Sequence, residues 1–396
     1  TSHELVVFNA NGTRDAAFDQ VTGKVDFLAQ QSNGKLVAHG FFFASNGLPA
    51  RRLTRINTDG TLDTGFLFTD NTDYSIRSIA VLRNDHILLG GRFSAFNGLP
   101  RNQLVRLKPD GLVDSAYVPA YRALLAVNRM LELRSRKLMV VSLYPGPYNQ
   151  HRNVLRLSEN GGEDSLYNMG TGFNGTPLDL YVQSSGRIIA GGDFYAYNGH
   201  NVRGITAIHP DGTRDTSFNP GGVGTDLYVR TIAEQPDGKL LIGGKFTLYN
   251  GDTASCIARL HPDGRRDTSF RTGDRFRYNT SGAGVTSIVV QPDGKILVGG
   301  NFYEQVVTGH VNPARLLPDG STDSTFHSAP YGVAAMALLP DGKIMIAGAQ
   351  GVPGQGYAAL RLHPDGTREF FGYNGAGELA WESRPYGTFP QTFLTV

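Results

Sequence analysis

Residues 285–302 read VTSIVVQPDGKILVGGNF, and residues 313–326 continue as PARLLPDGSTDSTF. Short apolar runs alternate here with Asp-Gly turns, a pattern typical of β-strands joined by tight hairpins. Glycine supplies the positive φ that such turns require. The stretch therefore predicts three strands and a short outer fourth strand, which we name a, b, c and d in chain order.

Both turn motifs of this stretch recur along the chain. P-D-G-K with its apolar run and G-G-x-F lies between consecutive copies of D/N-G-x-x-D-x-x-F, and no segment shows helical periodicity over ten residues or more. A hairpin of this size cannot bury its own face, so the repeats must pack on one another. We predict an all-β fold, one β-propeller domain over residues 1–396. The D/N-G copies begin at Asn11, Asp59, Asp110, Asn160, Asp211, Asp263, Asp319 and Asp365.

The number of blades depends on the two ends of the chain. Residues 378–396 carry Pro385-Tyr386-Gly387 where P-D-G stands elsewhere, which indicates a degenerate a–b hairpin. Residues 1–18 contain a D/N-G motif without a preceding hairpin, so they can supply strands c and d to the same blade. We predict eight four-stranded blades with the last one closed by both termini and Trp381 packed in it; the alternative is seven blades with an extra terminal hairpin.

The two alternating motifs resemble the delta-60 repeat, a β-propeller repeat of large bacterial secreted and surface proteins, and they are also similar to NHL-type blades. The resemblance covers essentially the whole chain. It implies a propeller that is secreted or at the cell surface, with any signal segment removed. It implies no shared catalytic residues.

Composition excludes several classes of protein. A formal charge of +2 and the lack of a basic stripe disfavour nucleic-acid binding. No apolar run approaches the roughly 18 residues that a membrane helix needs, so we predict no membrane insertion. The one cysteine, Cys256, excludes an intramolecular disulfide, and we expect it to be a small buried residue.

The recurring motif residues are expected to be structural. D-G-x-x-D offers two carboxylates at most, too few for a calcium loop of the EF-hand type, so we predict no metal. The second Asp is expected to accept N–H groups of its own turn, and the following Phe to wedge between blades. These residues are Asp63, Asp215, Asp267 and Asp323, and Phe66, Phe218, Phe270 and Phe326.

Hairpin topology places the a–b and c–d turns on one face, here called the turn face, and the b–c loops and d-to-a crossings on the other, here called the loop face. The turn face carries near-identical short turns, whereas the loop face carries variable segments and is the predicted binding surface. Aromatic rings beside Asn, Asp and Arg suit sugar rings and peptides alike, although many of these rings can instead pack between blades. The candidate ligand-binding residues are Phe96, Tyr144, Tyr148, His151, Arg152, Tyr195, Tyr197, His200, Tyr249 and Tyr303.

The third repeat departs most from the pattern. It lacks both P-D-G and G-G-x-F and introduces Arg129, Arg134 and Arg136 near those positions. Sequence drift and a binding site explain this change equally well.

Catalytic signals are weak, and no cofactor-binding motif is present, so no cofactor is predicted. Glu132 and Glu234 occupy the same strand-a slot in two repeats, four residues before the turn glycine position. If both faced the channel they could support glycoside hydrolysis, at carboxylate spacings of roughly 5 to 10 Å. Each Glu can instead be satisfied by a neighbouring Arg or by water. A Tyr with a His or Arg on the rim could alternatively serve a polysaccharide lyase.

Three function classes follow. The first, which we predict, is a non-catalytic extracellular binding or adhesion module that recognises a glycan or a surface protein on the loop face. The second is a structural scaffold of a bacterial surface or secretion assembly. The third is a polysaccharide-degrading enzyme, a lyase or a glycosidase, at the channel mouth.

Overall fold

The computed structural model describes residues 23–42, 51–68, 75–101, 103–119, 127–142, 154–168, 170–273, 276–278, 284–304, 313–327, 333–347 and 359–368. Every regular element within these ranges is a β-strand, and the sheets are antiparallel, so the all-β prediction is confirmed. The described residues fall into two compact units, unit 1 up to Leu166 and unit 2 from Tyr167 onward.

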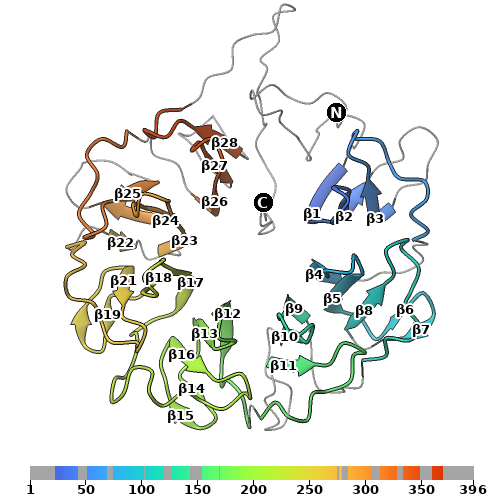
Figure 1. Ribbon diagram of the computed structural model, residues 1–396, viewed down its shortest axis with the longest axis horizontal. Helices are drawn as coiled ribbons and strands as arrows, with labels where there is room; N and C mark the ends of the chain where they lie inside the picture. Colours follow the sequence, from blue (N-terminus) through green and yellow to red (C-terminus); the bar gives the residue numbers. More distant parts are fainter. Residues whose placement is uncertain are drawn as a thin grey trace, which may run out of the picture. The chain divides into compact units, whose positions relative to one another are not determined.

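Unit 1 contains three blade sheets in the strand order a, b, c (Figure 1). The second blade adds a two-stranded hairpin in its b–c loop. The strands are β1 (Gly23–Gln30), β2 (Leu36–Phe42) and β3 (Arg51–Ile56); β4 (Ser75–Val81), β5 (Ile87–Arg92) and β8 (Leu104–Leu107) with the hairpin β6 (Ala95–Phe96) and β7 (Leu99–Pro100); and β9 (Val127–Glu132), β10 (Leu138–Ser142) and β11 (Val154–Leu157).

Unit 2 contains four blade sheets, whose a strands lie on the same side of the unit (Figure 1). Its first two blades carry b–c hairpins, and its third has an additional strand, β22, paired with strand b. The strands are β12 (Thr176–Val182), β13 (Ile188–Asp193), β14 (Ala196–Tyr197), β15 (His200–Asn201) and β16 (Ile205–Ile208); β17 (Val229–Glu234), β18 (Leu240–Gly244), β19 (Leu248–Tyr249), β20 (Asp252–Thr253) and β21 (Ile257–Leu260); β22 (Phe276–Tyr278), β23 (Gly284–Val290), β24 (Ile296–Glu304) and β25 (Ala314–Leu316); and β26 (Ala335–Leu338), β27 (Ile344–Ala347) and β28 (Ala359–Leu362).

The predicted outer strand d is reduced to a single bridge. In the β17 blade, for example, Leu260 and Arg266 form an isolated antiparallel bridge beyond strand c. The chain then turns at once, since the N–H of Phe270 donates to the carbonyl of Asp267. The predicted short outer strand d is therefore present only as one bridge in the described blades, because the D-x-x-F segment leaves the sheet to reach the next blade.

The motif phenylalanine packs against the following blade, as predicted. Phe218 belongs to a buried cluster that also contains Val229 and Ile242 of the next blade. A Cβ on Gly264 would lie 2.8 Å from the Phe218 ring, so glycine is required where the ring meets the next c–d turn. The N–H of Asn219 donates to the carbonyl of Asp263 in that same turn.

The motif aspartate organises its own turn, as predicted. The carboxylate of Asp267 accepts the backbone N–H of Ser269 at 3.0 Å, and it also accepts the Nε of Arg259 at 2.8 Å. Burial acts to raise the pKa of Asp267, but the hydrogen bonds from Ser269 and Lys239 and the charge of Arg259 outweigh it and lower that pKa. These carboxylates are structural groups of the blades. Cys256 is buried, as predicted.

The predicted closing blade, residues 378–396 with residues 1–18, lies outside the described residues, as does Trp381. The eight-blade count, its seven-blade alternative and the single-domain organisation therefore stay predictions. The boundary between the two units directly follows the third repeat, the one that lacks P-D-G and G-G-x-F.

Candidate functional site

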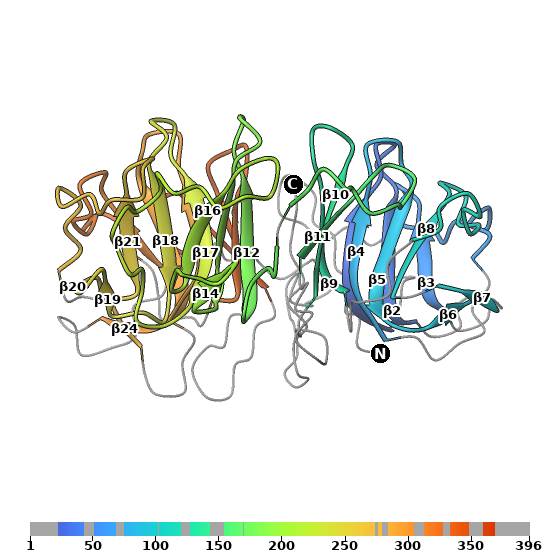
Figure 2. The same cartoon turned by 90° about the horizontal axis from the view of Figure 1, so that it is seen from below.

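The loop face of unit 2 is built from b–c hairpins held by the crossings that precede them. In Figure 2 the hairpins β14–β15 and β19–β20 lie at the same end of the unit's sheets. Asn198 and Gly199 both have positive φ (51° and 74°), which lets a two-residue turn close the β14–β15 hairpin. Thr225 of the crossing before β17 bridges to Tyr249 of the next hairpin. Loops and crossings therefore share one face in this unit, as predicted.

Asp226 fixes the crossing to the β19–β20 hairpin. Its carboxylate accepts the backbone N–H groups of Thr247 at 2.8 Å and Leu248 at 2.9 Å, and the Thr247 hydroxyl at 2.6 Å. Burial acts to raise the pKa of Asp226, but these hydrogen bonds lower it on balance. Asp226 therefore stays ionised at neutral pH and holds the surface rigid.

A surface that combines one aromatic ring, one cation and apolar side chains lies on this face. Tyr195 is 50 % exposed, and the Arg203 guanidinium stacks over its ring at 5.0 Å. The N–H of Arg203 donates to the carbonyl of Val223, which is 58 % exposed. We name this surface the loop-face patch; it comprises Tyr195, Arg203, Val223, Leu227 and Leu248.

Three candidate aromatics are buried rather than presented to a ligand. Phe96, Tyr197 and Tyr249 are at most 1 % exposed. The hydroxyl of Tyr197 donates to the carbonyl of Gly212 at 2.6 Å, and that of Tyr249 donates to the carbonyl of Gly264. The prediction that these rings form a binding platform is wrong, because the hairpin residue before Asn-Gly points into the blade, where Tyr197 and Tyr249 cap c–d turns.

The remaining loop-face candidates divide into two groups. Tyr195 and His200 are exposed, so both are available to a partner. Tyr303 lies on β24, but its side chain is outside the described part of the structure. Tyr144, Tyr148, His151 and Arg152 also lie outside the described residues, and they stay predictions.

The two strand-a glutamates each bind the preceding blade. The carboxylate of Glu132 accepts the backbone N–H of Arg83 at 2.9 Å. Glu234 accepts the Tyr181 hydroxyl at 2.9 Å and the side-chain amide of Gln183 at 2.5 Å. Glu132 belongs to unit 1 and Glu234 to unit 2. Both carboxylates have structural partners, which gives each of them a role that requires no catalysis.

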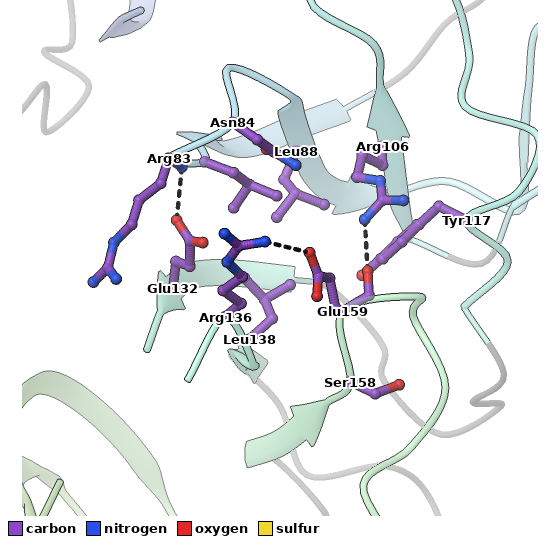
Figure 3. Close-up of a pocket in the computed structure, with 11 residues that line it drawn as sticks. Arg83, Asn84, Leu88, Arg106, Tyr117, Glu132, Arg136, Leu138, Ser158 and Glu159 are labelled. Carbon is purple, nitrogen blue, oxygen red and sulfur yellow. Dashed lines mark hydrogen bonds and ion pairs between the residues drawn. The ribbon is translucent and has the colours of Figure 1, made fainter. Parts of the chain in front are cut away.

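Unit 1 contains a pocket of about 170 Å³ on its turn face, between the blades of β4 and β9 (Figure 3). Arg106 donates to the backbone carbonyl of Glu159 at 2.6 Å, and Arg136 forms an ion pair of 3.4 Å with the Glu159 carboxylate. Tyr117 and Glu132 also line the pocket. The turn face of unit 1 therefore carries a recess as well as short turns.

Comparison with known proteins places the repeats in a family. The family described as "Domain of unknown function (DUF5122) beta-propeller" matches residues 31–66, 83–117, 183–218, 235–270, 291–326 and 339–369, more than half of the chain. The chain belongs to this family. The β-propeller prediction is thereby confirmed, while the delta-60 name stays a resemblance. No curated protein matches the chain.

Solved structures similar to this DUF5122 propeller are distant. The extracellular domain of a one-component system protein, BT4673 of B. thetaiotaomicron, has 13 % identity and a TM-score of 0.45, over 83 % of this chain and 39 % of its own. The WD40 propeller of Doa1 has 12 % identity and a TM-score of 0.45, over 87 % and 93 % of the two chains. PorZ, a surface component of the type-IX secretion system of Porphyromonas gingivalis, has 9 % identity and a TM-score of 0.41, over 85 % and 46 %. Such likenesses indicate no function for this chain.

The DUF5122 match skips the third repeat, since no matched range lies between residues 118 and 182. This repeat supplies Glu132, Arg136 and Glu159 to the pocket of unit 1. Where most other repeats have Phe, Gly and Pro, the pocket has Tyr117, Arg136 and Glu159; the exceptions include Tyr167, Asp85 and Thr58. These departures from the repeat were the signal that could have located the pocket from sequence.

Two further findings concern the described ranges only. They contain no group of three or more His, Cys, Asp or Glu side chains arranged to hold a metal ion. No helix in them is long and apolar enough to span a membrane.

Proposed function

We propose that this DUF5122 propeller is a non-catalytic, extracellular binding or adhesion module, secreted or at the cell surface, that recognises a glycan or a surface protein. The observation that carries the proposal is the loop-face patch of unit 2. A half-exposed tyrosine ring with a stacked guanidinium offers a flat apolar surface with hydrogen-bond donors beside it. This combination suits a sugar ring or an aromatic or apolar side chain of a partner.

The surroundings of the patch favour binding over catalysis. Val223 and Leu227, exposed beside Arg203, extend the apolar area without adding an acid or a base. The one carboxylate fixed into this segment, Asp226, is fully engaged by Thr247 and Leu248. A rigid surface of this composition needs little rearrangement on binding, which favours affinity.

A glycan-array screen of the purified chain, with a turnover assay on the same polysaccharides, tests the proposal. We expect saturable binding without product, weakened at least tenfold by Tyr195→Ala and by Arg203→Ala. The control is Arg265→Ala, which removes an exposed arginine from a c–d turn of the same unit. Product formation would contradict the non-catalytic role and direct attention to Glu132 and Glu234.

If no glycan binds, the proposal requires a surface protein as the partner. A photo-crosslinking residue at position 223 tests for such a partner directly. We expect this residue to capture one surface protein, and capture to be lost in the Tyr195→Ala background. If the array is negative and position 223 captures nothing, the proposed function is wrong.

A further inference from the structure

The pocket of unit 1 lies on the turn face of that unit, where the a–b turns of the β4 and β9 blades approach the chain after β11. Figure 3 shows Arg106, Tyr117, Arg136 and Glu159 converging on it from both blades. Its volume of about 170 Å³ is below the roughly 300–1,000 Å³ of pockets for drug-sized ligands. It therefore suits one small molecule or one residue of a larger chain.

Tyr117 contributes a buried hydroxyl group without a hydrogen-bond partner. The residue is 2 % exposed, and its ring stacks under the Arg106 guanidinium at 4.3 Å. Burial raises the pKa of Tyr117, so the hydroxyl remains a donor at neutral pH. An unpaired buried hydroxyl is destabilising, a cost that Phe66 and Phe218 avoid at the equivalent position. A ligand that accepts a hydrogen bond from this hydroxyl gives Tyr117 a role that phenylalanine cannot fill.

Arg136 occupies a turn position where five of the described a–b turns have glycine and the β4 blade has Asp85. Its φ is 59°, in the left-handed region that is unfavourable for a residue with a side chain. The ion pair with Glu159 does not offset this cost, because the Arg136 side chain is 67 % exposed and such pairs contribute little. Strain of this kind clusters at functional sites, and here it accompanies an exposed guanidinium that lines the pocket.

The charges around the pocket balance. Arg106 is paired with Asp114 at 2.8 Å and Arg136 with Glu159 at 3.4 Å, which leaves the charges of Arg83 and Glu132 among the lining residues. An anionic or cationic ligand would upset this balance, whereas hydroxyl groups can accept from guanidinium groups and donate to carboxylates. Apolar side chains of Leu82, Leu88 and Leu138 complete the lining and suit the C–H face of a ring.

We propose that this pocket binds one neutral sugar residue, with the Tyr117 hydroxyl and the Arg136 guanidinium as donors and Glu132 and Glu159 as acceptors. The site lies on the turn face of unit 1, and it does not depend on the proposed function of the loop-face patch. It also gives a reason for the departures of the third repeat at Arg136 and Glu159.

The test uses the full chain with four probes, D-glucose, D-galactose, D-mannose and N-acetyl-D-glucosamine, titrated separately by saturation-transfer-difference NMR. Inorganic phosphate and acetate are the anionic comparison. Tyr117→Phe and Arg136→Gly each restore the residue that other blades have, so both variants are expected to fold. Tyr167→Phe is the matched control, because it makes the same change at the equivalent position of the next blade.

We expect at least one sugar to bind saturably, with affinity lowered at least fivefold by Tyr117→Phe and by Arg136→Gly and unchanged by Tyr167→Phe. The midpoint of thermal unfolding should stay the same or rise in Arg136→Gly. Absence of binding by all four sugars, tighter binding of phosphate or acetate, or full affinity in both pocket variants would overturn the proposal. Tyr195→Ala should leave sugar binding in this pocket intact, which separates this result from the glycan-array test.

Discussion

Arg259 donates a hydrogen bond of 2.8 Å from Nε to the carboxylate of Asp267, and both side chains are buried. The same guanidinium stacks on Phe270 at 4.7 Å and donates from Nη1 to the carbonyl of Pro318 in the next blade. One arginine thus connects its own D-x-x-F segment to the neighbouring c–d turn. Equivalent arginines that stack on the motif ring and reach the next blade are Arg55, Arg106 and Arg315.

Removal of one partner of this buried pair should destabilise the protein strongly. Asp267→Ala leaves the Arg259 charge buried and uncompensated, which we expect to lower the free energy of unfolding by about 3–5 kcal/mol. Urea denaturation followed by circular dichroism measures the change. The control is Asp263→Ala, which removes an ion pair of the same length, 2.8 Å to Arg265, from the surface and should cost less than about 1 kcal/mol. Equal losses in the two variants would contradict the bridging role of Arg259.

Stability should fall on acidification. The pKa values of the motif aspartates lie below their ordinary value of 3.8 in the folded state, so the unfolded chain binds protons first as the pH falls. Their contribution is fully present above about pH 5, and it is lost as the pH falls through 3.8 toward the folded pKa values. The groups are Asp63, Asp114, Asp164, Asp215, Asp267 and Asp323.

Urea midpoints measured from pH 7 to pH 2.5 check this dependence. We expect the urea midpoint to be constant at the upper end of this pH range and to decline steeply below pH 4. The decline should be shallower in Asp267→Asn, because one fewer carboxylate takes up a proton on unfolding. A midpoint that rises between pH 5 and pH 3 would show that the sign is wrong.

Alanine substitutions at two turn glycines distinguish the effect of backbone strain from that of a steric clash. Gly264 has a φ of 80° and lies against Phe218, so a Cβ there meets the ring at 2.8 Å; Gly251 has a φ of 90° and an open surrounding. Gly251→Ala should cost about 1–2 kcal/mol from the left-handed backbone alone. Gly264→Ala should cost a further 1–3 kcal/mol or so, because the neighbouring blade must move. Similar unfolding free energies for the two variants would show that the Phe218 contact is loose.

Much of the fold was predictable because its signals are local. An Asp-Gly turn with apolar runs on either side determines a hairpin within about ten residues, as in the segment around Gly294. The turn-stabilising role of Asp267 could be predicted because the N–H groups that it accepts lie within the same turn. The packing role of Phe218 could be predicted because a blade must bury its face against a neighbouring blade. Strand d was overestimated, because the same local pattern does not show that the chain leaves the sheet after one bridge.

The candidate site was less predictable because it depends on distant contacts. Tyr195 and Tyr197 are two residues apart, yet one is exposed and the other caps Gly212. Alternation along a strand would place both on one face, but Tyr195 lies between β13 and β14, where its N–H bonds to Asn174 of the preceding crossing. The pocket of unit 1 likewise needs two neighbouring blades, so the sequence could show that Tyr117 and Arg136 depart from most repeats but not that both line one pocket.

Substitutions of the buried Tyr249 and the half-exposed Tyr195 should change the stability of the protein to different extents. Tyr249→Phe removes the donor to the Gly264 carbonyl in the interior and should lower the free energy of unfolding by about 1–3 kcal/mol. Tyr249→Ala also leaves a cavity and should cost about 3–5 kcal/mol, by analogy with other buried aromatics. Tyr195→Ala changes a half-exposed side chain and should stay within about 1 kcal/mol of the wild type, mainly from the lost stacking with Arg203.

Thermal and urea unfolding of the three tyrosine variants, measured beside partner binding, checks this ranking. Loss of binding in Tyr195→Ala with an unchanged unfolding midpoint would assign that residue to the surface that meets the partner. Loss of binding in Tyr249→Ala together with a lower midpoint would reflect the blade rather than a contact. If Tyr249→Phe lost binding at full stability, the Tyr249 hydroxyl would have to reach the partner, and its assignment to the Gly264 turn would be wrong.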